Sequence, residues 1–138
     1  MYGKHETKLA RSAGVETKKI RGDSSDLKRV RDNYSLLVEA TGSPSCLALA
    51  QHMTEPHGTL VLKSTYHGAA PVETWPIVVK EINVIGSRCG PFAKAIALLR
   101  AGKVDLEPLE THTFPLADAQ AAITFAQLPR VMKVFLKA

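Results

Sequence analysis

With 138 residues, the chain has room for one domain with a substantial hydrophobic core and hardly for two. Hydrophobic residues make up 45% and charged residues 22%, as in an ordinary soluble protein, and no apolar run approaches the ~18 residues of a membrane span. Two widely separated cysteines exclude a disulfide scaffold, and five scattered histidines show no zinc-binding spacing. Because the first residues also lack the apolar stretch of a signal peptide, we expect a cytoplasmic protein with no membrane partner.

The formal net charge of +5 is concentrated at the beginning of the chain. Residues 1–31 hold nine of the 18 lysines and arginines but only four of the 13 acids, whereas the remainder is balanced. Such a segment could bind a nucleic acid, a membrane surface or a phosphorylated small molecule, or it could be a solvated helix face. Tyr2 and Tyr34 are the only aromatic residues in the N-terminal third of the chain, so no platform for stacking bases is evident.

The first residues predict short elements. A helix is expected over residues 5–13 with Gly14 as its C-cap, and a short strand within residues 15–20. Asp23 or Ser24 then suits the N-cap of a short amphipathic helix.

A strand–helix–strand unit follows. Residues 36–40 form an almost continuous apolar run, which is typical of a strand buried on both faces. Residues 41–44 (TGSP) predict a turn that places Pro44 at the first helical position, and apolar residues repeat with helical spacing over 46–53. We expect the sequence Pro-His-Gly to end that helix before a second strand over 59–62. The two strands should then be parallel neighbours.

The rest of the chain alternates between predicted strands and helices. No glycine-rich G-x-G-x-x-G or P-loop spacing is present. The fold class is therefore α/β with a mainly parallel, incomplete Rossmann-like sheet that contains only later strands. The remaining predicted elements are a strand over 82–86, a helix over 90–104 that Gly102 closes, an extended segment over 109–116, a helix over 117–126 and a strand over 132–136.

Three stretches follow one another in the order of a known enzyme family. They read VEATGSPSCLALAQHMTEPHGTLVL, GSRCGPFAKAIALLRAGKVDLEPLETHTFPLADAQAAITFA and MKVFLKA. The first is similar to the fourth and fifth Rossmann strands of the medium-chain, zinc-type alcohol dehydrogenases, with the helix between them. The second resembles the segment from the sixth strand into the end of their catalytic domain, and the third resembles their terminal strand. This resemblance covers nearly the whole chain, over residues 2–138.

The resemblance implies a division of the chain. Residues 1–90 correspond to a partial dinucleotide-binding domain, and residues 91–138 to the C-terminal segment of the catalytic domain, packed with it as one unit. The family transfers hydride between a nicotinamide cofactor and a zinc-bound alcohol or carbonyl. Because its glycine-rich fingerprint and zinc ligands precede the matching region, we expect a C-terminal portion with no catalytic or metal-binding residue of its own and no turnover in isolation.

The resemblance also implies a cofactor and a partner. Gly3 and Lys4 fall at the end of the second Rossmann strand, with Lys8 one helical turn on. An acid at that place would bind the ribose of NAD, whereas basic residues admit the extra phosphate of NADP. We therefore expect NADP rather than NAD, although these lysines could simply be solvated. The family dimerises through sheet edges, so residues 82–87 (INVIGS) suggest a homodimer.

Most of the other candidate cofactor residues lie at strand ends, where ligands bind in open α/β sheets. Lys133 lies in the terminal strand, at a place where the resembled family often has a basic residue on the pyrophosphate. The turn after the strand 36–40 would meet a ribose, and the resemblance implies that the loop after 59–62 holds the nicotinamide carboxamide. A turn without a ligand and a surface ion pair are the alternatives for these positions. A non-enzymatic nucleotide- or nucleic-acid-binding module remains the alternative function. The candidate residues are Thr41, Gly42, Ser64, Thr65, Arg88 and Lys133.

Overall fold

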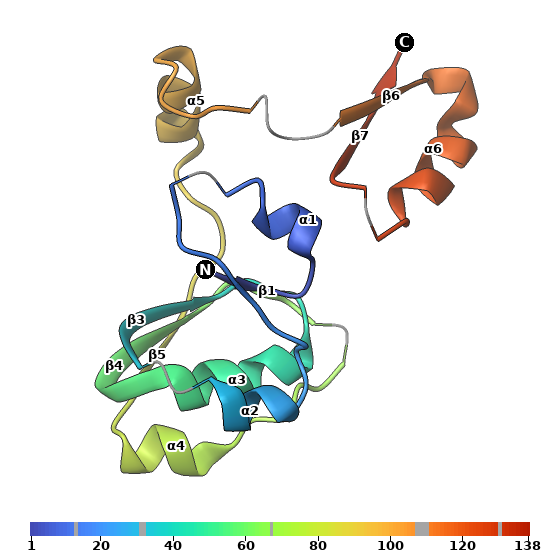
Figure 1. Cartoon of the computed structure of the whole chain (residues 1–138). Helices are drawn as coiled ribbons and strands as arrows, with labels where there is room; N and C mark the ends of the chain where they lie inside the picture. Colours follow the sequence, from blue (N-terminus) through green and yellow to red (C-terminus); the bar gives the residue numbers. More distant parts are fainter. Residues whose placement is uncertain (13, 31–32, 67, 107–110, 130) are drawn as a thin grey trace. The chain divides into compact units, whose positions relative to one another are not determined.

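The computed structural model describes residues 1–12, 14–30, 33–66, 68–106, 111–129 and 131–138. These residues form two compact units, whose elements are labelled in Figure 1. The sheet unit contains residues 2–4 and 19–89, and the terminal unit contains residues 1, 5–18 and 90–138. The predicted division after residue 90, and the packing of both parts as one unit, stay predictions.

A parallel three-stranded sheet forms the centre of the sheet unit (Figure 1). Its order is β3 (Tyr34–Glu39), β4 (Thr54–Leu62) and β5 (Asn83–Gly86). Helix α3 (Pro44–Met53) connects β3 to β4, and α4 (Thr74–Val79) lies between β4 and β5. The predicted α/β class with a mainly parallel sheet is therefore confirmed.

Helix α3 supplies most of the core. It begins as predicted, with Ser43 in extended conformation at the N-cap and Pro44 at the first helical position. Its apolar side chains repeat at helical spacing and lie on two sides of the helix, and each side packs into a separate core cluster. One cluster contains Ile20, Cys46, Leu49 and Met53, and the other contains Leu47, Ala50, Leu60 and Ile82.

Strand β3 is buried on one face only. Leu37 packs against both core clusters and Glu39 is buried, whereas Leu36 and Val38 are 62% and 52% exposed. The expectation of a strand buried on both faces is therefore wrong for the described residues. Alternation sends successive side chains to opposite faces, and α3 covers the face that carries Leu37. The other face, which we call the open face, carries Leu36 and Val38.

The second predicted boundary also differs from the structure. Helix α3 ends at Met53 and β4 starts at Thr54, so Pro-His-Gly at 56–58 lies within the strand rather than before it. The side chain of Thr54 donates to the Ala50 carbonyl at 2.8 Å and closes the helix. The three residues are accommodated by an irregularity in the β3–β4 register, where His57 has a φ of 61°.

The N-terminal elements are shorter than expected. The predicted helix over 5–13 is α1 (Glu6–Leu9), which has its C-cap at Ala10 and not at Gly14, and residue 13 lies outside the described residues. Two-residue strands flank it, β1 (Tyr2–Gly3) and β2 (Lys18–Lys19). Helix α2 (Ser25–Arg29) follows Ser24, in agreement with the predicted N-cap.

The terminal unit contains α5 and a second parallel strand pair. Helix α5 (Phe92–Arg100) is followed by Gly102, with a φ of +63°, as predicted. The pair consists of β6 (Thr111–Pro115) and β7 (Lys133–Lys137), with the short helix η1 (Leu116–Asp118) and α6 (Ala119–Ala126) between them. Residues 109–110 of the predicted extended segment lie outside the described residues. No helix among the described residues is both long and apolar enough to cross a membrane.

Candidate cofactor site

The carboxyl ends of β3, β4 and β5 lie at one edge of the sheet, since the three strands are parallel. Each strand is followed there by predicted site residues: Thr41 and Gly42 after β3, Ser64 and Thr65 after β4, and Arg88 after β5. Thr41, Gly42, Thr65 and Arg88 are exposed, and Ser64 is half-buried. The structure therefore brings these five residues to the same sheet edge.

Gly42 is tied to the neighbouring loop. Its backbone N–H donates to the Ser64 hydroxyl at 2.8 Å, which links the turn after β3 to the loop after β4. Gly42 has a φ of +68°, a left-handed conformation that favours glycine, and open space lies where a Cβ would stand. A ligand could therefore approach the backbone closely at this point.

The third strand end is joined to the second by a lysine. The Lys63 ammonium donates to the Arg88 carbonyl at 2.5 Å and lies 3.5 Å from the Ser87 hydroxyl. These contacts fix the backbone of Arg88, while its side chain remains exposed to solvent. The edge thus presents hydroxyl groups, an exposed turn and a guanidinium.

Sequence reasoning missed the most highly buried charged group at this edge, the Glu39 carboxylate. Glu39 is 2% exposed, and one carboxylate oxygen accepts hydrogen bonds from the Thr41 backbone N–H at 2.8 Å and its hydroxyl at 2.5 Å. The other oxygen accepts a hydrogen bond from the Tyr66 hydroxyl at 2.6 Å. The signal in the sequence was an acid inside an otherwise apolar strand, because a buried carboxylate requires donors.

Burial and the hydrogen bond between Glu39 and Tyr66 change the pKa values of both side chains. Burial alone would raise the pKa of Glu39, but hydrogen bonds from Thr41 and Tyr66 outweigh burial and hold its pKa below the ordinary value. Burial, followed by the hydrogen bond to Glu39 and its negative charge, raises the pKa of Tyr66 to about 12. Because Glu39 has a lowered pKa, its contribution to stability is present above its ordinary pKa and is lost as the pH falls through the lowered value.

The shifted phenol gives a direct test of this contact. In the variant Glu39→Gln the negative charge is absent, so we expect the pKa of Tyr66 to fall from about 12 towards the ordinary value near ~10. Absorbance titration of the three tyrosines measures this change, and Tyr66→Phe identifies the high-pH component. An unchanged titration in Glu39→Gln would contradict the hydrogen-bonded pair.

Lys4 reaches the same turn from β1. Its ammonium donates to the Ser43 hydroxyl at 3.0 Å, directly after Gly42. Gly22 makes this path possible, because a Cβ added there would lie only 1.8 Å from the Lys4 side chain. Sequence reasoning placed Gly3 and Lys4 near the cofactor but did not find the contact with Ser43 or the need for Gly22.

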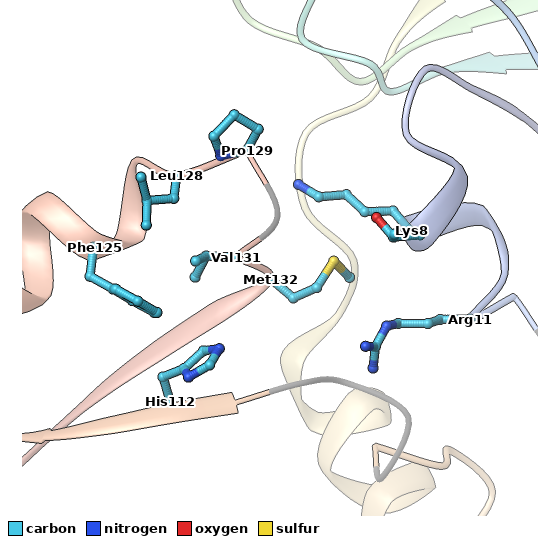
Figure 2. Close-up of a pocket in the computed structure, with 9 residues that line it drawn as sticks. Lys8, Arg11, His112, Phe125, Leu128, Pro129, Val131 and Met132 are labelled. Atoms are coloured by element: carbon cyan, nitrogen blue, oxygen red, sulfur yellow. The ribbon is translucent and has the colours of Figure 1, made fainter.

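Lys8 and Lys133 belong to the terminal unit, whereas the other predicted site residues belong to the sheet unit. Lys133 is exposed at the start of β7. Lys8 lines a cavity of about 480 Å³ within the terminal unit, in which cationic and apolar side chains face one another (Figure 2). The other lining residues are Thr7, Arg11, His112, Phe125, Leu128, Pro129, Val131 and Met132.

The described residues do not fit a metal site. Nowhere in the described part of the chain do three His, Cys, Asp or Glu side chains come together closely enough to hold a metal ion. His52 pairs with Glu73 at 3.2 Å, and His57 pairs with Glu81 at 3.0 Å, each without a third ligand. The edge formed by Thr41, Gly42 and Ser64 instead fits one wall of a dinucleotide site, because its backbone is exposed and open to close approach.

The relatives of this chain are sugar-alcohol dehydrogenases. The chain is 34% identical over 108 residues to a sorbitol dehydrogenase of Gallus gallus, with 74% of this chain and 29% of that protein covered. It is 30% identical over 109 residues to D-arabinitol dehydrogenase 1 of Uromyces fabae, with 75% and 31% covered. The chain thus spans about a third of the length of the curated relatives it matches. No protein-family model matches it.

Solved structures share the fold at low identity. L-idonate 5-dehydrogenase of Escherichia coli K-12 superposes with a TM-score of 0.83 at 22% identity, over 99% of this chain and 42% of that one. An E. coli CFT073 alcohol dehydrogenase in complex with NADH gives 0.76 at 23%, over 96% and 42%. Staphylococcus aureus TarJ in complex with NADPH gives 0.74 at 14%, over 99% and 46%.

These comparisons agree with the parallel sheet described above, and they give a nucleic-acid-binding module no support. The similarity fits the C-terminal portion of longer enzymes, as the sequence motifs predicted. The resemblance carried by the sequence motifs is therefore confirmed: the chain is similar in sequence to sorbitol and arabinitol dehydrogenases, and it shares its fold with solved alcohol dehydrogenases, one of them zinc-bound.

Proposed function

We propose that this chain is the cofactor-binding, C-terminal part of a dehydrogenase that transfers hydride between a nicotinamide cofactor and an alcohol or carbonyl. The observation that carries the proposal is the sheet edge at which Gly42 and Ser64 join two exposed loops by a hydrogen bond. Ligands bind at such edges in open α/β sheets. The nicotinamide supplies the hydride chemistry when bound, and the residues of this chain bind and orient it.

The proposed roles follow the strand ends. The exposed backbone of Thr41 and Gly42 accepts the ribose, and the loop with Ser64 and Thr65 holds the carboxamide. The exposed cationic side chain of Arg88 binds a phosphate group of the cofactor. Neutral groups thus position the sugar and the amide, while cations bind the phosphates.

NADP is the preferred cofactor in this proposal. Lys4 brings a positive charge to Ser43, beside the Gly42 turn. A phosphate ester gains more from this charge than a ribose hydroxyl does. The comparisons do not discriminate between NAD and NADP for this chain, since one similar structure holds NADH and another holds NADPH.

The remainder of the reaction lies outside this chain in the proposal. The catalytic zinc belongs to the rest of the complete enzyme, where it polarises an alcohol or carbonyl oxygen. We propose a cytoplasmic enzyme and a homodimer joined through the edge strand β5, which has β4 as its only neighbour in the described sheet.

Titration calorimetry of the purified chain tests this function. We expect NADPH to bind more tightly than NADH, and Lys4→Met to weaken NADPH binding about tenfold, because a hydrogen bond to a charged group contributes about 1.5–3 kcal/mol. Lys28→Met, an exposed lysine on α2, is the matched control and should leave the affinity unchanged. No turnover of NADPH with simple aldehydes or ketones is expected.

Two results would contradict the proposal. Failure of the wild-type chain to bind either nucleotide would overturn its role in cofactor binding. Sustained oxidation of NADPH by pure chain, in the presence of a metal chelator, would overturn the assignment of the chemistry to the rest of the enzyme.

A further inference from the structure

The turn after β3 and the loop after β4 are joined by two side-chain links at the sheet edge. In the first, the Tyr66 hydroxyl donates to the Glu39 carboxylate at 2.6 Å. In the second, the Gly42 N–H donates to the Ser64 hydroxyl at 2.8 Å. Both links bridge residues more than 20 positions apart, so they cross from one loop to the other rather than stabilise either loop alone.

Glu39 connects this bridge to the exposed turn. The carboxylate oxygen that does not face Tyr66 accepts both the backbone N–H and the hydroxyl of Thr41. A buried carboxylate holds its donors strongly, because leaving any of its hydrogen bonds unmade costs more than a neutral pair would. The orientation of Thr41 is therefore coupled through Glu39 to the position of Tyr66.

The region that this arrangement controls is otherwise weakly held. Thr41 and Gly42 lie between the end of β3 and the start of α3, outside both elements, and both are exposed. Exposed segments with few buried contacts open locally at little free-energy cost. The hydrogen bonds that Glu39 accepts from Thr41 and that Ser64 accepts from Gly42 thus restrain the turn, in addition to the local bond from the Ser43 N–H to the Thr41 hydroxyl at 3.2 Å.

We propose that Glu39 and Tyr66 are positioning residues, which hold the Thr41–Gly42 turn against the loop after β4 in the conformation that receives the cofactor. Neither side chain contacts the ligand in this arrangement. Tyr66 acts on Glu39, Glu39 acts on Thr41, and the exposed backbone of Thr41 and Gly42 meets the ribose. This inference rests on the proposed function for its ligand, but the restraint itself is a property of the chain alone.

Amide hydrogen exchange of the whole chain, measured residue by residue, tests the restraint without any ligand. In Tyr66→Phe we expect exchange at Thr41 and Gly42 to become about tenfold faster, because one hydrogen bond to a charged group is lost. The amide of Leu60, in the middle of β4, should keep its rate. Tyr34→Phe is the matched control, since its hydroxyl contacts Tyr2 at the opposite end of β3.

A second variant and a second measurement separate positioning from general stability. Glu39→Gln keeps an acceptor for Thr41 but removes the charge, and it should accelerate exchange at Thr41 to a smaller extent. NADPH affinity, measured on the same samples, should fall in Tyr66→Phe by the factor by which the fraction of chains with a closed turn decreases, and the exchange rates at Thr41 and Gly42 give that fraction. The midpoint of thermal unfolding of each variant shows whether the whole chain has been destabilised.

Each outcome of these measurements supports or contradicts the proposed restraint of the turn. Unchanged exchange at Thr41 and Gly42 overturns the restraint, and equal acceleration at Leu60 reduces the pair to a general structural role. An NADPH affinity that does not follow the fraction of chains with a closed turn shows that the restraint does not serve the ligand and overturns the proposal. If the wild-type chain binds neither nucleotide, the proposed function fails, while the exchange rates still decide whether Glu39 and Tyr66 hold the turn.

Discussion

Replacing Leu60 with alanine is expected to lower the free energy of unfolding of the sheet unit by about 3 kcal/mol, within the usual range for a buried leucine. Leu60 is 1% exposed on the central strand β4 and packs with Leu47, Ala50 and Ile82. The substitution removes apolar contacts and leaves a cavity that the strand, paired on both sides, cannot close by moving.

Denaturant unfolding followed by tryptophan fluorescence measures this loss. Trp75 is the single tryptophan of the chain and lies in α4, so its emission reports on the sheet unit. Leu36→Ala is the matched control, because Leu36 lies on the neighbouring strand but on the open face. That variant should change stability by no more than about 0.5 kcal/mol. Equal losses in the two variants would contradict the core described above.

The second large effect is expected at Asp26, where alanine should cost about 2 kcal/mol of unfolding free energy. The Asp26 side chain is 1% exposed and accepts hydrogen bonds from the backbone N–H groups of Arg21, at 3.2 Å, and Gly22, at 2.5 Å. Without the carboxylate, these two donors lose their partner in a segment that also positions Lys4. The buried N–H of Gly22, left without the carboxylate, carries most of the expected cost.

The same fluorescence assay, with Glu81→Gln as the control in the same unit, tests the role of Asp26. Glu81 is an exposed acid that pairs with the exposed His57 at 3.0 Å, and a surface pair of this kind contributes little. Asp26→Asn should lose less than Asp26→Ala, because one oxygen remains to accept a hydrogen bond. A loss at Glu81 that matches the loss at Asp26 would show that burial of the carboxylate is not the cause.

The strands and the main helices could be predicted from the sequence because their signals are local. Pro44 and the helical spacing of apolar residues defined α3, and apolar runs marked β3, β4 and β5. The boundary at Thr54 could not be predicted, since Pro-His-Gly ordinarily ends an element. Here the register irregularity beside β3 keeps these residues in the strand, and register depends on the neighbouring strand.

The candidate site likewise contains residues that the sequence could predict and contacts that it could not. Thr41, Gly42 and Ser64 could be predicted because the carboxyl ends of parallel strands meet at one edge. The pairing of Glu39 with Tyr66 spans 27 positions and depends on how the loop after β4 folds back, which no spacing in the sequence specifies. Burial on only one face of β3 was equally hidden, because Leu36 and Leu37 are chemically alike and only the packed helix distinguishes them.

The open face of the sheet determines how ionic strength acts on solutions of this protein. Leu36 and Val38 on that face offer apolar surface to another molecule, while the net charge of +5 repels such an encounter. The range of that repulsion shrinks from ~30 Å at 0.01 M salt to ~8 Å at 0.15 M. Added salt therefore favours association, so a nucleotide affinity measured in dilute buffer refers to separate chains, and one measured at high salt to a mixture.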